Sequence, residues 1–207
     1  MPPMKRCEQT AGFILAGGAS SRMGRDKALL EIGGVPLVVR TARLIEPLVA
    51  SVTVVAPPGR YETLGLRLLA DDFPAAGPLG GVLTALRASA AEWNFVVACD
   101  LPYLRAEFIE WLLTRATASP KDAHVPESAR GLEPLCSVYH ARCRPILAAK
   151  FAQGVRKLVD ALAGLNIEPV PESEWRQWDP EGLLLQNMNT PEDYEGPRRR
   201  LERRAAP

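Results

Sequence analysis

The sequence lacks long apolar runs and has few cysteines and histidines, and these shortages exclude several classes of protein. No apolar run reaches the length of a membrane span. The charges near the N-terminus are not followed by an apolar segment, so a secretory signal peptide is not expected. The four cysteines form no C-x-x-C pair, and no histidine cluster accompanies them. They are therefore interpreted as free thiols of a cytoplasmic protein rather than as a zinc site or a disulfide framework.

Most of the chain also has no large excess of positive or negative charge. The chain has 25 Lys and Arg and 24 Asp and Glu, which gives a net charge of +1. Residues 198–207 hold five of the arginines and one glutamate, which leaves 20 basic and 23 acidic residues elsewhere. Nucleic acid is therefore not an expected partner. We predict one domain over residues 11–195, a flexible N-terminus over 1–10, and a basic, frayed tail over 196–207 that could alternatively bind an anionic partner.

Short apolar runs alternate with helical patterns along the first half of the chain. Strands are predicted at 11–16, 51–56, 66–70 and 95–99, and helices at 36–47, at 82–91 and around 108–113. In the second half, strands are predicted at 132–139, 166–170 and 183–185, and helices at 142–152 and 154–163. This alternation predicts a single three-layer α/β domain with a mostly parallel, Rossmann-like central sheet.

The first predicted strand ends abruptly at Gly17 and Gly18, and two cations, Arg22 and Lys27, follow five positions apart. Glycines let the backbone approach a ligand closely, and backbone N–H groups together with cations bind phosphates. The spacing matches neither the P-loop nor the dinucleotide fingerprint. The stretch therefore predicts a phosphate-binding loop, the alternative being a simple glycine turn with two solvated cations.

Two acidic positions follow predicted strands. Asp100 comes directly after 95–99, and either Asp71 or its neighbour Asp72 comes after 66–70. Because ligands bind at the carboxyl ends of parallel strands, we expect these carboxylates and the glycine-rich loop to share one edge of the sheet. A single carboxylate there suits Mg²⁺, which completes its coordination with phosphates and water. The alternative for each Asp is a turn or helix cap.

Four segments in order along the chain resemble nucleotidyltransferases, and among these the molybdenum cofactor guanylyltransferases. They are Leu15-Ala16-Gly17-Gly18-x-Ser20-x-Arg22-Met23-Gly24-x-Asp26-Lys27-Ala28-Leu29-Leu30, Gly77-Pro78-Leu79-Gly80-Gly81, Val96-Val97-Ala98-Cys99-Asp100-Leu101-Pro102 and Asn187-x-Asn189-Thr190-Pro191. The resemblance implies the nucleotide-diphospho-sugar transferase fold and transfer of GMP from GTP to the terminal phosphate of molybdopterin or Mo-molybdopterin, with release of pyrophosphate. It also implies Mg²⁺ as cofactor, with Mn²⁺ as the alternative.

The resemblance further implies roles for individual residues. Arg22, Lys27 and Asp100 would be catalytic, and Asp100 would hold the metal. The nucleotide would be bound by Leu15, Ala16, Gly17, Gly18, Lys27, Asp71, Gly77, Gly81 and Asp100. The acceptor would meet Arg156, Asn187 and Asn189, for which a surface cation and a helix cap are the alternatives. Proteins that deliver the cofactor would be further partners.

Other functions stay open at this point. Gly18 gives Leu-Ala-Gly-Gly, which resembles the guanine-specific type, whereas cytidylyl relatives typically have Leu-Ala-Ala-Gly. The alternative enzymes are a cytidylyltransferase on the same cofactor and a sugar-phosphate nucleotidyltransferase. A non-catalytic nucleotide-binding or cofactor-carrier module is the alternative outside the enzymes. One family position does not carry over, because an Asn often found near the end of the second strand is replaced here by Val55-Ala56-Pro57.

Overall fold

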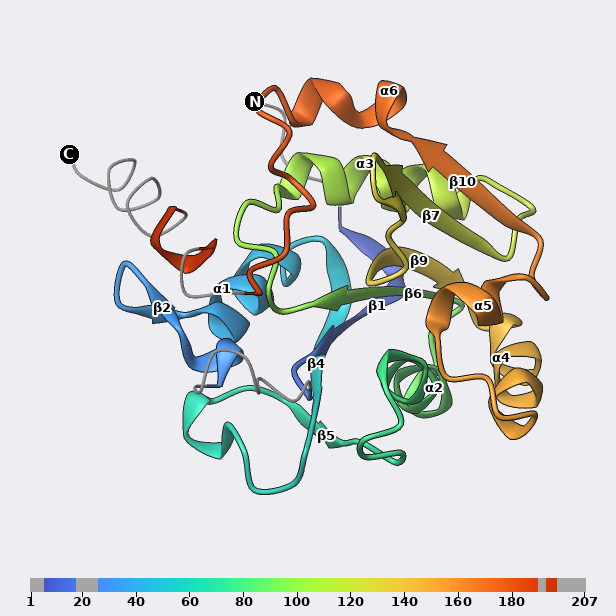
Figure 1. Ribbon diagram of the computed structural model, residues 1–207, viewed down its shortest axis with the longest axis horizontal. Coiled ribbons are helices and arrows are strands. Elements are labelled where there is room, and N and C mark those ends of the chain that lie inside the picture. Colours follow the sequence, from blue (N-terminus) through green and yellow to red (C-terminus); the bar gives the residue numbers. More distant parts are fainter. Residues whose placement is uncertain (1–5, 18–25, 190–192, 197–207) are drawn as a thin grey trace.

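The computed structural model describes residues 6–17, 26–189 and 193–196, which are built around a central β-sheet (Figure 1). Its strands are β1 (Cys7–Leu15), β4 (Val49–Ala56), β5 (Leu68–Ala70), β6 (Trp93–Ala98), β7 (Ala123–Ser128), β8 (Gly131–Leu132), β9 (Cys136–His140) and β10 (Ile167–Pro171). The strand order is β10-β7-β9-β6-β1-β4-β5, with β8 paired to β7. A separate two-stranded sheet consists of β2 (Glu31–Ile32) and β3 (Val35–Pro36).

Most of the main sheet is parallel. β1 pairs in parallel with both β4 and β6, β4 pairs in parallel with β5, and β10 pairs in parallel with β7. The antiparallel strand β9 lies between β6 and β7, and β8 is antiparallel to β7. The predicted α/β class with a mostly parallel sheet is confirmed.

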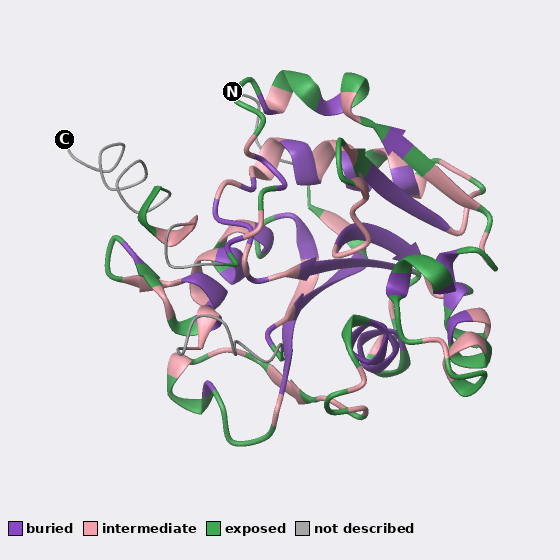
Figure 2. Cartoon of the chain, viewed as in Figure 1, coloured by how far each residue is buried: buried purple, intermediate pink, exposed green. Residues whose placement is uncertain are grey.

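Helices cover both faces of the sheet. They are α1 (Leu37–Ile45), α2 (Pro78–Ala88), α3 (Ala106–Thr117), α4 (Cys143–Ala152), α5 (Leu158–Leu162) and α6 (Glu172–Trp175), with 3-10 turns η1 (Lys27–Leu29), η2 (Glu62–Leu64) and η3 (Arg176–Trp178). One buried apolar cluster packs α1, α3 and α6 against one face of the sheet, and a second packs α2, α4 and α5 against the other. Figure 2 shows β1 and β6 buried between these layers, so the fold has the predicted three layers.

The register of the parallel strands explains where a ligand site can form. Leu15 lies opposite both Val55 and Ala98, and Ala56 lies opposite Ala70. The carboxyl ends of β1, β4, β5 and β6 therefore lie side by side. The residues that follow these strands meet at one edge of the sheet, as predicted from the sequence.

Two corrections concern the start of β1 and the start of α2, the helix that follows β5. β1 begins at Cys7, so the prediction of a flexible N-terminus over 1–10 is wrong for residues 7–10, which the register joins to the sheet. Helix α2 begins at Pro78 instead of residue 82. Its two glycines, Gly80 and Gly81, suggested a loop, but both are buried in the first turn of the helix.

Two further corrections concern the second half of the chain. Strand β7 was not predicted, because Pro126 and Glu127 interrupt its apolar pattern. The strand predicted over 183–185 is wrong, since these residues form a turn in which the Leu183 N–H donates to Asp179 Oδ1 at 2.7 Å. Leu184 and Leu185 are buried there, which explains the apolar run without a strand.

Other sequence predictions concern single residue types and the chain ends. The four cysteines, Cys7, Cys99, Cys136 and Cys143, are free thiols. Among the described residues, no helix combines the length and apolar character needed to cross a bilayer. The predicted basic tail, 196–207, lies outside the described residues except for Gly196.

Candidate functional site

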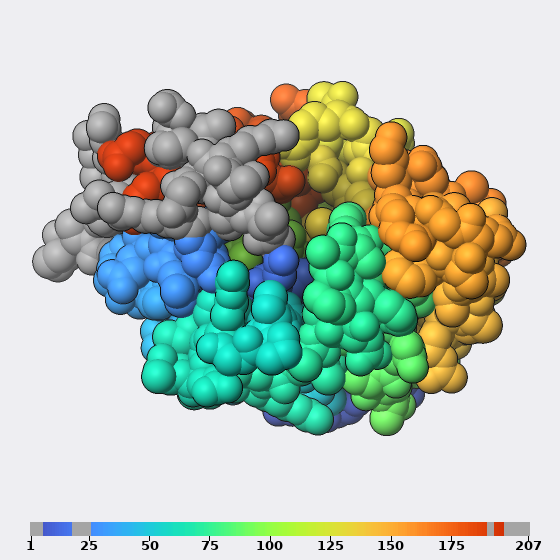
Figure 3. Space-filling model, turned by 60° about the horizontal axis from the view of Figure 1, so that its bottom comes forward, coloured from blue at the N-terminus to red at the C-terminus, as the bar shows by residue number. Residues whose placement is uncertain are grey.

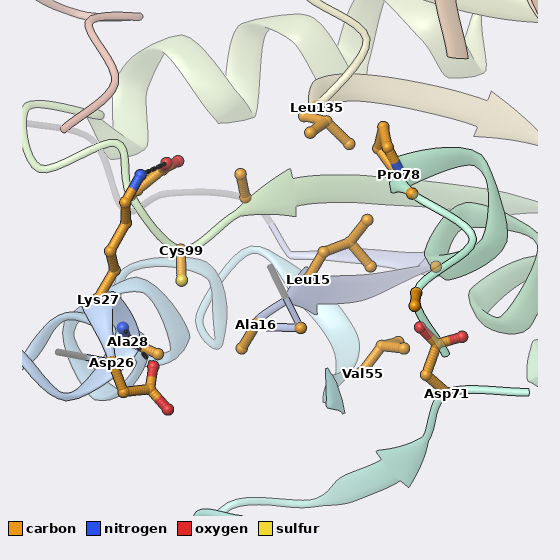
Figure 4. A pocket seen from close by; sticks show the side chains of 16 residues that line it. Leu15, Ala16, Asp26, Lys27, Ala28, Val55, Asp71, Pro78, Cys99 and Leu135 are labelled. Atoms are coloured by element: carbon orange, nitrogen blue, oxygen red, sulfur yellow. Dashed lines mark hydrogen bonds and ion pairs between the residues drawn. The ribbon is translucent and has the colours of Figure 1, made fainter. Parts of the chain in front are cut away.

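A cavity of about 480 Å³ opens where the strands β1, β4, β5 and β6 end. Its lining residues are Leu15, Ala16, Gly17, Asp26, Lys27, Ala28, Val55, Asp71, Ala75, Gly77, Pro78, Gly81, Ala98, Cys99, Asp100 and Leu135. Figure 3 shows the surface hollowed here, between the teal segment that follows β4 and the green segment around α2. In the close-up of Figure 4, Lys27 and Asp71 lie on opposite sides, with Leu15 and Ala16 between them. The volume suits a ligand of nucleotide size.

Lys27 and Asp100 form an ion pair on one side of the cavity. Lys27 Nζ lies 3.6 Å from Asp100 Oδ2, and the two side chains are only 19% and 17% exposed. Asp100 Oδ1 is buried and accepts no hydrogen bond from the described residues. Burial raises the pKa of Asp100, and the charge of Lys27 opposes this shift. The carboxylate is therefore partly desolvated and has one oxygen left for a further cation.

The donor set around Asp100 can be tested against a divalent cation. The described residues contain no cluster of three or more His, Cys, Asp or Glu side chains, so they provide no complete metal cage. Mg²⁺ commonly binds one or two carboxylates and takes its other ligands from substrate phosphates and water. The unpaired Oδ1 of Asp100 fits that mode, and Mn²⁺ accepts the same oxygen ligands.

A segment from the C-terminal part of the chain contacts both Lys27 and Asp100. The Met188 N–H donates to the Asp100 carbonyl at 3.0 Å, and Met188 is buried against Ile32 and Leu37. Lys27 Nζ donates to Asn189 Oδ1 at 2.9 Å. Asn189, predicted on the acceptor side, is thus bound to Lys27 in this structure. We name residues 187–189 the closing segment.

Asp71 is held in a defined orientation on the opposite side. Its Oδ1 accepts hydrogen bonds from the Phe73 N–H and from the hydroxyl of Thr84, both at 2.9 Å. Asp72 instead pairs with Arg87 at 3.4 Å and does not line the cavity. Of the two aspartates, Asp71 therefore lines the cavity and Asp72 does not. Thr84 was not singled out in the sequence, where its only signal is a hydroxyl in an otherwise apolar stretch of helix.

The N-terminus of α2 opens on the cavity beside Asp71. Gly77 caps the helix with φ 77° and ψ −173°, a conformation that is essentially restricted to glycine, and Pro78 takes the first helical position. The first N–H groups of a helix have no partner within it and favour an anion or a polar ligand. A Cβ at Gly81 would lie 3.2 Å from Leu15 Cδ1, so glycine allows α2 to pack closely on β1.

A second cavity of about 460 Å³ adjoins the first. The two share Gly77, Pro78 and Leu135 as lining residues. Asn187 and Arg156, both predicted to bind an acceptor, line this second cavity, and so does Lys157. The Arg156 guanidinium, however, donates to the carbonyls of Phe151 and Val155, both at 2.9 Å, and stacks on the Phe151 ring. Its charged end is thereby held by the last turn of α4 and by the preceding residue of its own loop.

The structure brings most of the predicted site residues together. The predicted nucleotide-binding residues that it describes all line the first cavity, namely Leu15, Ala16, Gly17, Lys27, Asp71, Gly77, Gly81 and Asp100. Gly18 and Arg22 lie outside the described residues. Val55, near the end of β4, adds an apolar side chain to the wall. Cys99 also lines the cavity, but burial raises the pKa of its thiol and keeps it neutral.

Comparisons with known proteins give consistent results. Residues 12–166 match the model of the MobA-like NTP transferase domain. The chain is 37% identical over 191 residues to a probable molybdenum cofactor guanylyltransferase of Nostoc sp. (strain PCC 7120), covering 87% of this chain and 86% of the relative. A relative with the same description from Thermococcus gammatolerans is 37% identical over 193 residues, covering 88% of this chain and 95% of the relative.

Two solved structures superpose on nearly the whole of this chain. The molybdopterin-guanine dinucleotide biosynthesis protein A of Archaeoglobus fulgidus superposes with a TM-score of 0.82 at 25% identity, covering 93% of this chain and 99% of that chain. The 2-C-methyl-D-erythritol 4-phosphate cytidylyltransferase of Thermus thermophilus superposes with a TM-score of 0.71 at 17% identity, covering 93% and 98%. The second likeness concerns the fold alone.

Proposed function

Because the chain belongs to the family of MobA-like NTP transferase domains, we propose that it transfers GMP from GTP to the terminal phosphate of molybdopterin, in its metal-free or molybdenum-loaded form. The observation that carries this proposal is the placement of Lys27 and Asp100 at one side of a nucleotide-sized cavity and of Asp71 at the other. The names of the relatives support the choice of donor and acceptor.

The base would bind on the side of Asp71. With Oδ1 occupied by Phe73 and Thr84, the other oxygen of the Asp71 carboxylate accepts hydrogen bonds from the ligand. Guanine offers a ring N–H and an adjacent amino group as two neighbouring donors, and the two lone pairs of this one oxygen can accept from both. Leu15 and Val55 supply apolar walls for the purine ring. Adenine and cytosine lack this pair of donors, so the site favours guanine.

The triphosphate would lie on the side of the cavity that Gly17, Lys27 and Asp100 line. Lys27 would contact the phosphates and stabilise the departing pyrophosphate, as expected for a positioned cation at a developing charge. Asp100 would hold Mg²⁺, or Mn²⁺ in its place, through the oxygen that has no protein partner. The metal, when bound, neutralises phosphate charge and makes the α-phosphorus a better electrophile. The role predicted for Arg22 at this side remains a proposal.

The acceptor would occupy the second cavity, next to the shared wall at Gly77 and Leu135. An oxygen of its terminal phosphate attacks the α-phosphorus of GTP, and the bond from that phosphorus to the bridging oxygen breaks to release pyrophosphate. A phosphate is already ionised near pH 7, so the reaction needs alignment rather than a strong base. Lys157 and Asn187 line this cavity and are our candidates for the acceptor, because the Arg156 guanidinium is already bound to the carbonyls of Phe151 and Val155.

The proposal is tested by titration calorimetry of GTP, CTP and ATP, each with Mg²⁺, followed by a pyrophosphate-release assay with molybdopterin. We expect tight binding of GTP only, and release that requires both acceptor and metal. Preference for CTP would instead assign the chain to the cytidylyl alternative. Saturable GTP binding without metal-dependent release would indicate a nucleotide-binding module. Asp100→Asn is the matched variant, expected to bind GTP but to lose at least about a hundredfold in turnover.

A further inference from the structure

Tyr61 has an unusual backbone conformation for a large side chain. Its φ of 65° and ψ of 9° lie in the left-handed region, and among the described residues only one other non-glycine residue, Ala75, has a positive φ. Such a conformation is costly for a residue with a Cβ and persists where the surrounding contacts impose it. Tyr61 is also 6% exposed, so its ring is fixed by packing.

The hydroxyl of Tyr61 lies between two borders of the nucleotide cavity. Its Oη lies 2.7 Å from Asp26 Oδ2 and 3.0 Å from the carbonyl oxygen of Ala16. Ala16 directly follows β1, Asp26 directly precedes η1, and both line the cavity. One side chain from a different part of the chain therefore lies against both the residue that follows the first strand and the N-cap residue of the turn carrying Lys27.

Asp26 transmits this link to Lys27. It is the N-cap residue of η1, and its Oδ1 accepts a hydrogen bond from the Ala28 N–H at 3.1 Å. Lys27 is the first residue of the same turn and reaches Asp100 and Asn189 from it. A rotation of the Asp26 carboxylate would disturb the cap and so displace the base of the Lys27 side chain.

The other partner of the Asp26 carboxylate is less suited to this task. Arg60 Nη1 lies 3.2 Å from the same Oδ2, but the Arg60 side chain is 51% exposed. A long, solvated side chain holds a carboxylate weakly, because its ordering costs entropy and water screens the charge. Burial raises the pKa of Tyr61, so its hydroxyl keeps its proton and stays a hydrogen-bond donor throughout the neutral range.

We propose that Tyr61 is a positioning residue that fixes Asp26, and through it the turn bearing Lys27, so that Lys27 can stabilise the departing pyrophosphate during turnover. The proposal rests on the function proposed above only for what Lys27 acts upon. The strained, buried tyrosine determines the orientation of the Asp26 carboxylate that caps the turn, and turnover depends on this orientation.

Tyr61→Phe tests the proposal, since it removes only the hydroxyl. We expect kcat for pyrophosphate release to fall between about three- and thirtyfold, with KM for GTP changed less than about threefold, because the hydroxyl is lost but the charge of Lys27 remains. Hydrogen exchange of the ligand-free protein gives a second readout. The amide of Ala28, which donates to Asp26, should exchange at least about threefold faster than in the wild type.

Tyr139→Phe is the matched control. Its hydroxyl is also buried and donates to a carbonyl, that of Pro134, at 2.7 Å, so the variant loses a similar bond without touching Asp26. It should lose comparable stability while keeping the wild-type kcat and Ala28 exchange. If Tyr61→Phe behaves like this control in both readouts, the positioning role is refuted. If the wild type shows no GTP turnover, the proposed function fails, and Ala28 exchange alone decides the positioning role.

Discussion

The substitution Lys27→Met tests how the site tolerates a desolvated carboxylate. Methionine keeps most of the length of the side chain, which becomes one atom shorter, and removes its charge. At 3.6 Å, the attraction between Lys27 and Asp100 is about 4–5 kcal/mol for an effective dielectric constant of about 20. Breaking a fully buried pair costs about 3–5 kcal/mol and breaking an exposed pair less than about 1 kcal/mol. Because both side chains are mostly but not fully buried, we expect a loss of about 2 kcal/mol in unfolding free energy near pH 8.

The pH dependence of this loss has a definite sign. Without Lys27, the pKa of Asp100, already raised by burial, rises further. A carboxyl whose folded pKa exceeds its unfolded value destabilises the fold above the unfolded value, and the penalty disappears as the pH falls until both states are protonated. The stability difference between Lys27→Met and the wild type should therefore shrink from pH 8 to about pH 4.

Urea unfolding across this pH range, combined with a pyrophosphate-release assay, measures both consequences. The double variant Lys27→Met/Asp100→Asn should regain most of the lost stability, because no uncompensated charge remains. Its turnover should stay at least about a hundredfold below the wild type, since the loss of one such cation costs about 3 kcal/mol in the transition state. A single variant as stable as the wild type at pH 8 would refute the reasoning.

Three further predictions concern other described residues. Because the Thr84 hydroxyl orients Asp71, Thr84→Val should raise KM for GTP about five- to thirtyfold with little change in kcat. Thr84→Ser keeps a hydroxyl and should have a KM for GTP close to that of the wild type. Burial lowers the pKa of His124, so as the pH falls the unfolded chain protonates this histidine before the folded protein does. Thermal stability should therefore decrease as the pH falls below about 6.5. His124→Gln should make this decrease smaller in calorimetric scans. Gly77→Ala should lower the free energy of unfolding in urea by about 1–3 kcal/mol and weaken GTP binding. Gly182→Ala is the control, because Gly182 also has a positive φ but lines neither cavity. It should lose stability while GTP binding stays unchanged.

The parts of the fold that the sequence predicted are those with a strong local signal. β1, β4 and β6 each contain an apolar run in their C-terminal half, and they were placed to within a few residues. β7 has no such run, because Pro126 and Glu127 interrupt it, and only its pairing with neighbouring strands makes it a strand. The glycines at the start of α2 suggested a loop, but close packing on Leu15 accounts for Gly81 within a helix.

In the candidate site, too, the residues with a local sequence signal were predicted and the others were not. Lys27, Asp71 and Asp100 follow strands or a glycine-rich loop, so the rule that ligands bind at strand ends was enough to bring them together. Tyr61 and Thr84 act through contacts that no local pattern contains. Tyr61 is 45 positions from Ala16, and Thr84 is 13 positions from Asp71. Their importance depends on tertiary packing and became visible only in the structure.

The closing segment has a consequence for the synthesis of the protein. Asn189 is 162 positions from Lys27, and the Tyr194 hydroxyl donates to the carbonyl of Glu31 at a similar separation. Chains are made from the N-terminus, and contacts over such separations form late in folding. The strands around the cavity can assemble on a nascent chain, but Lys27 and Asp100 gain their last partners only when residues 188 and 189 have been added. A nascent or truncated chain that lacks residues 188 and 189 therefore carries an unfinished site, in which Lys27 and Asp100 are without these contacts.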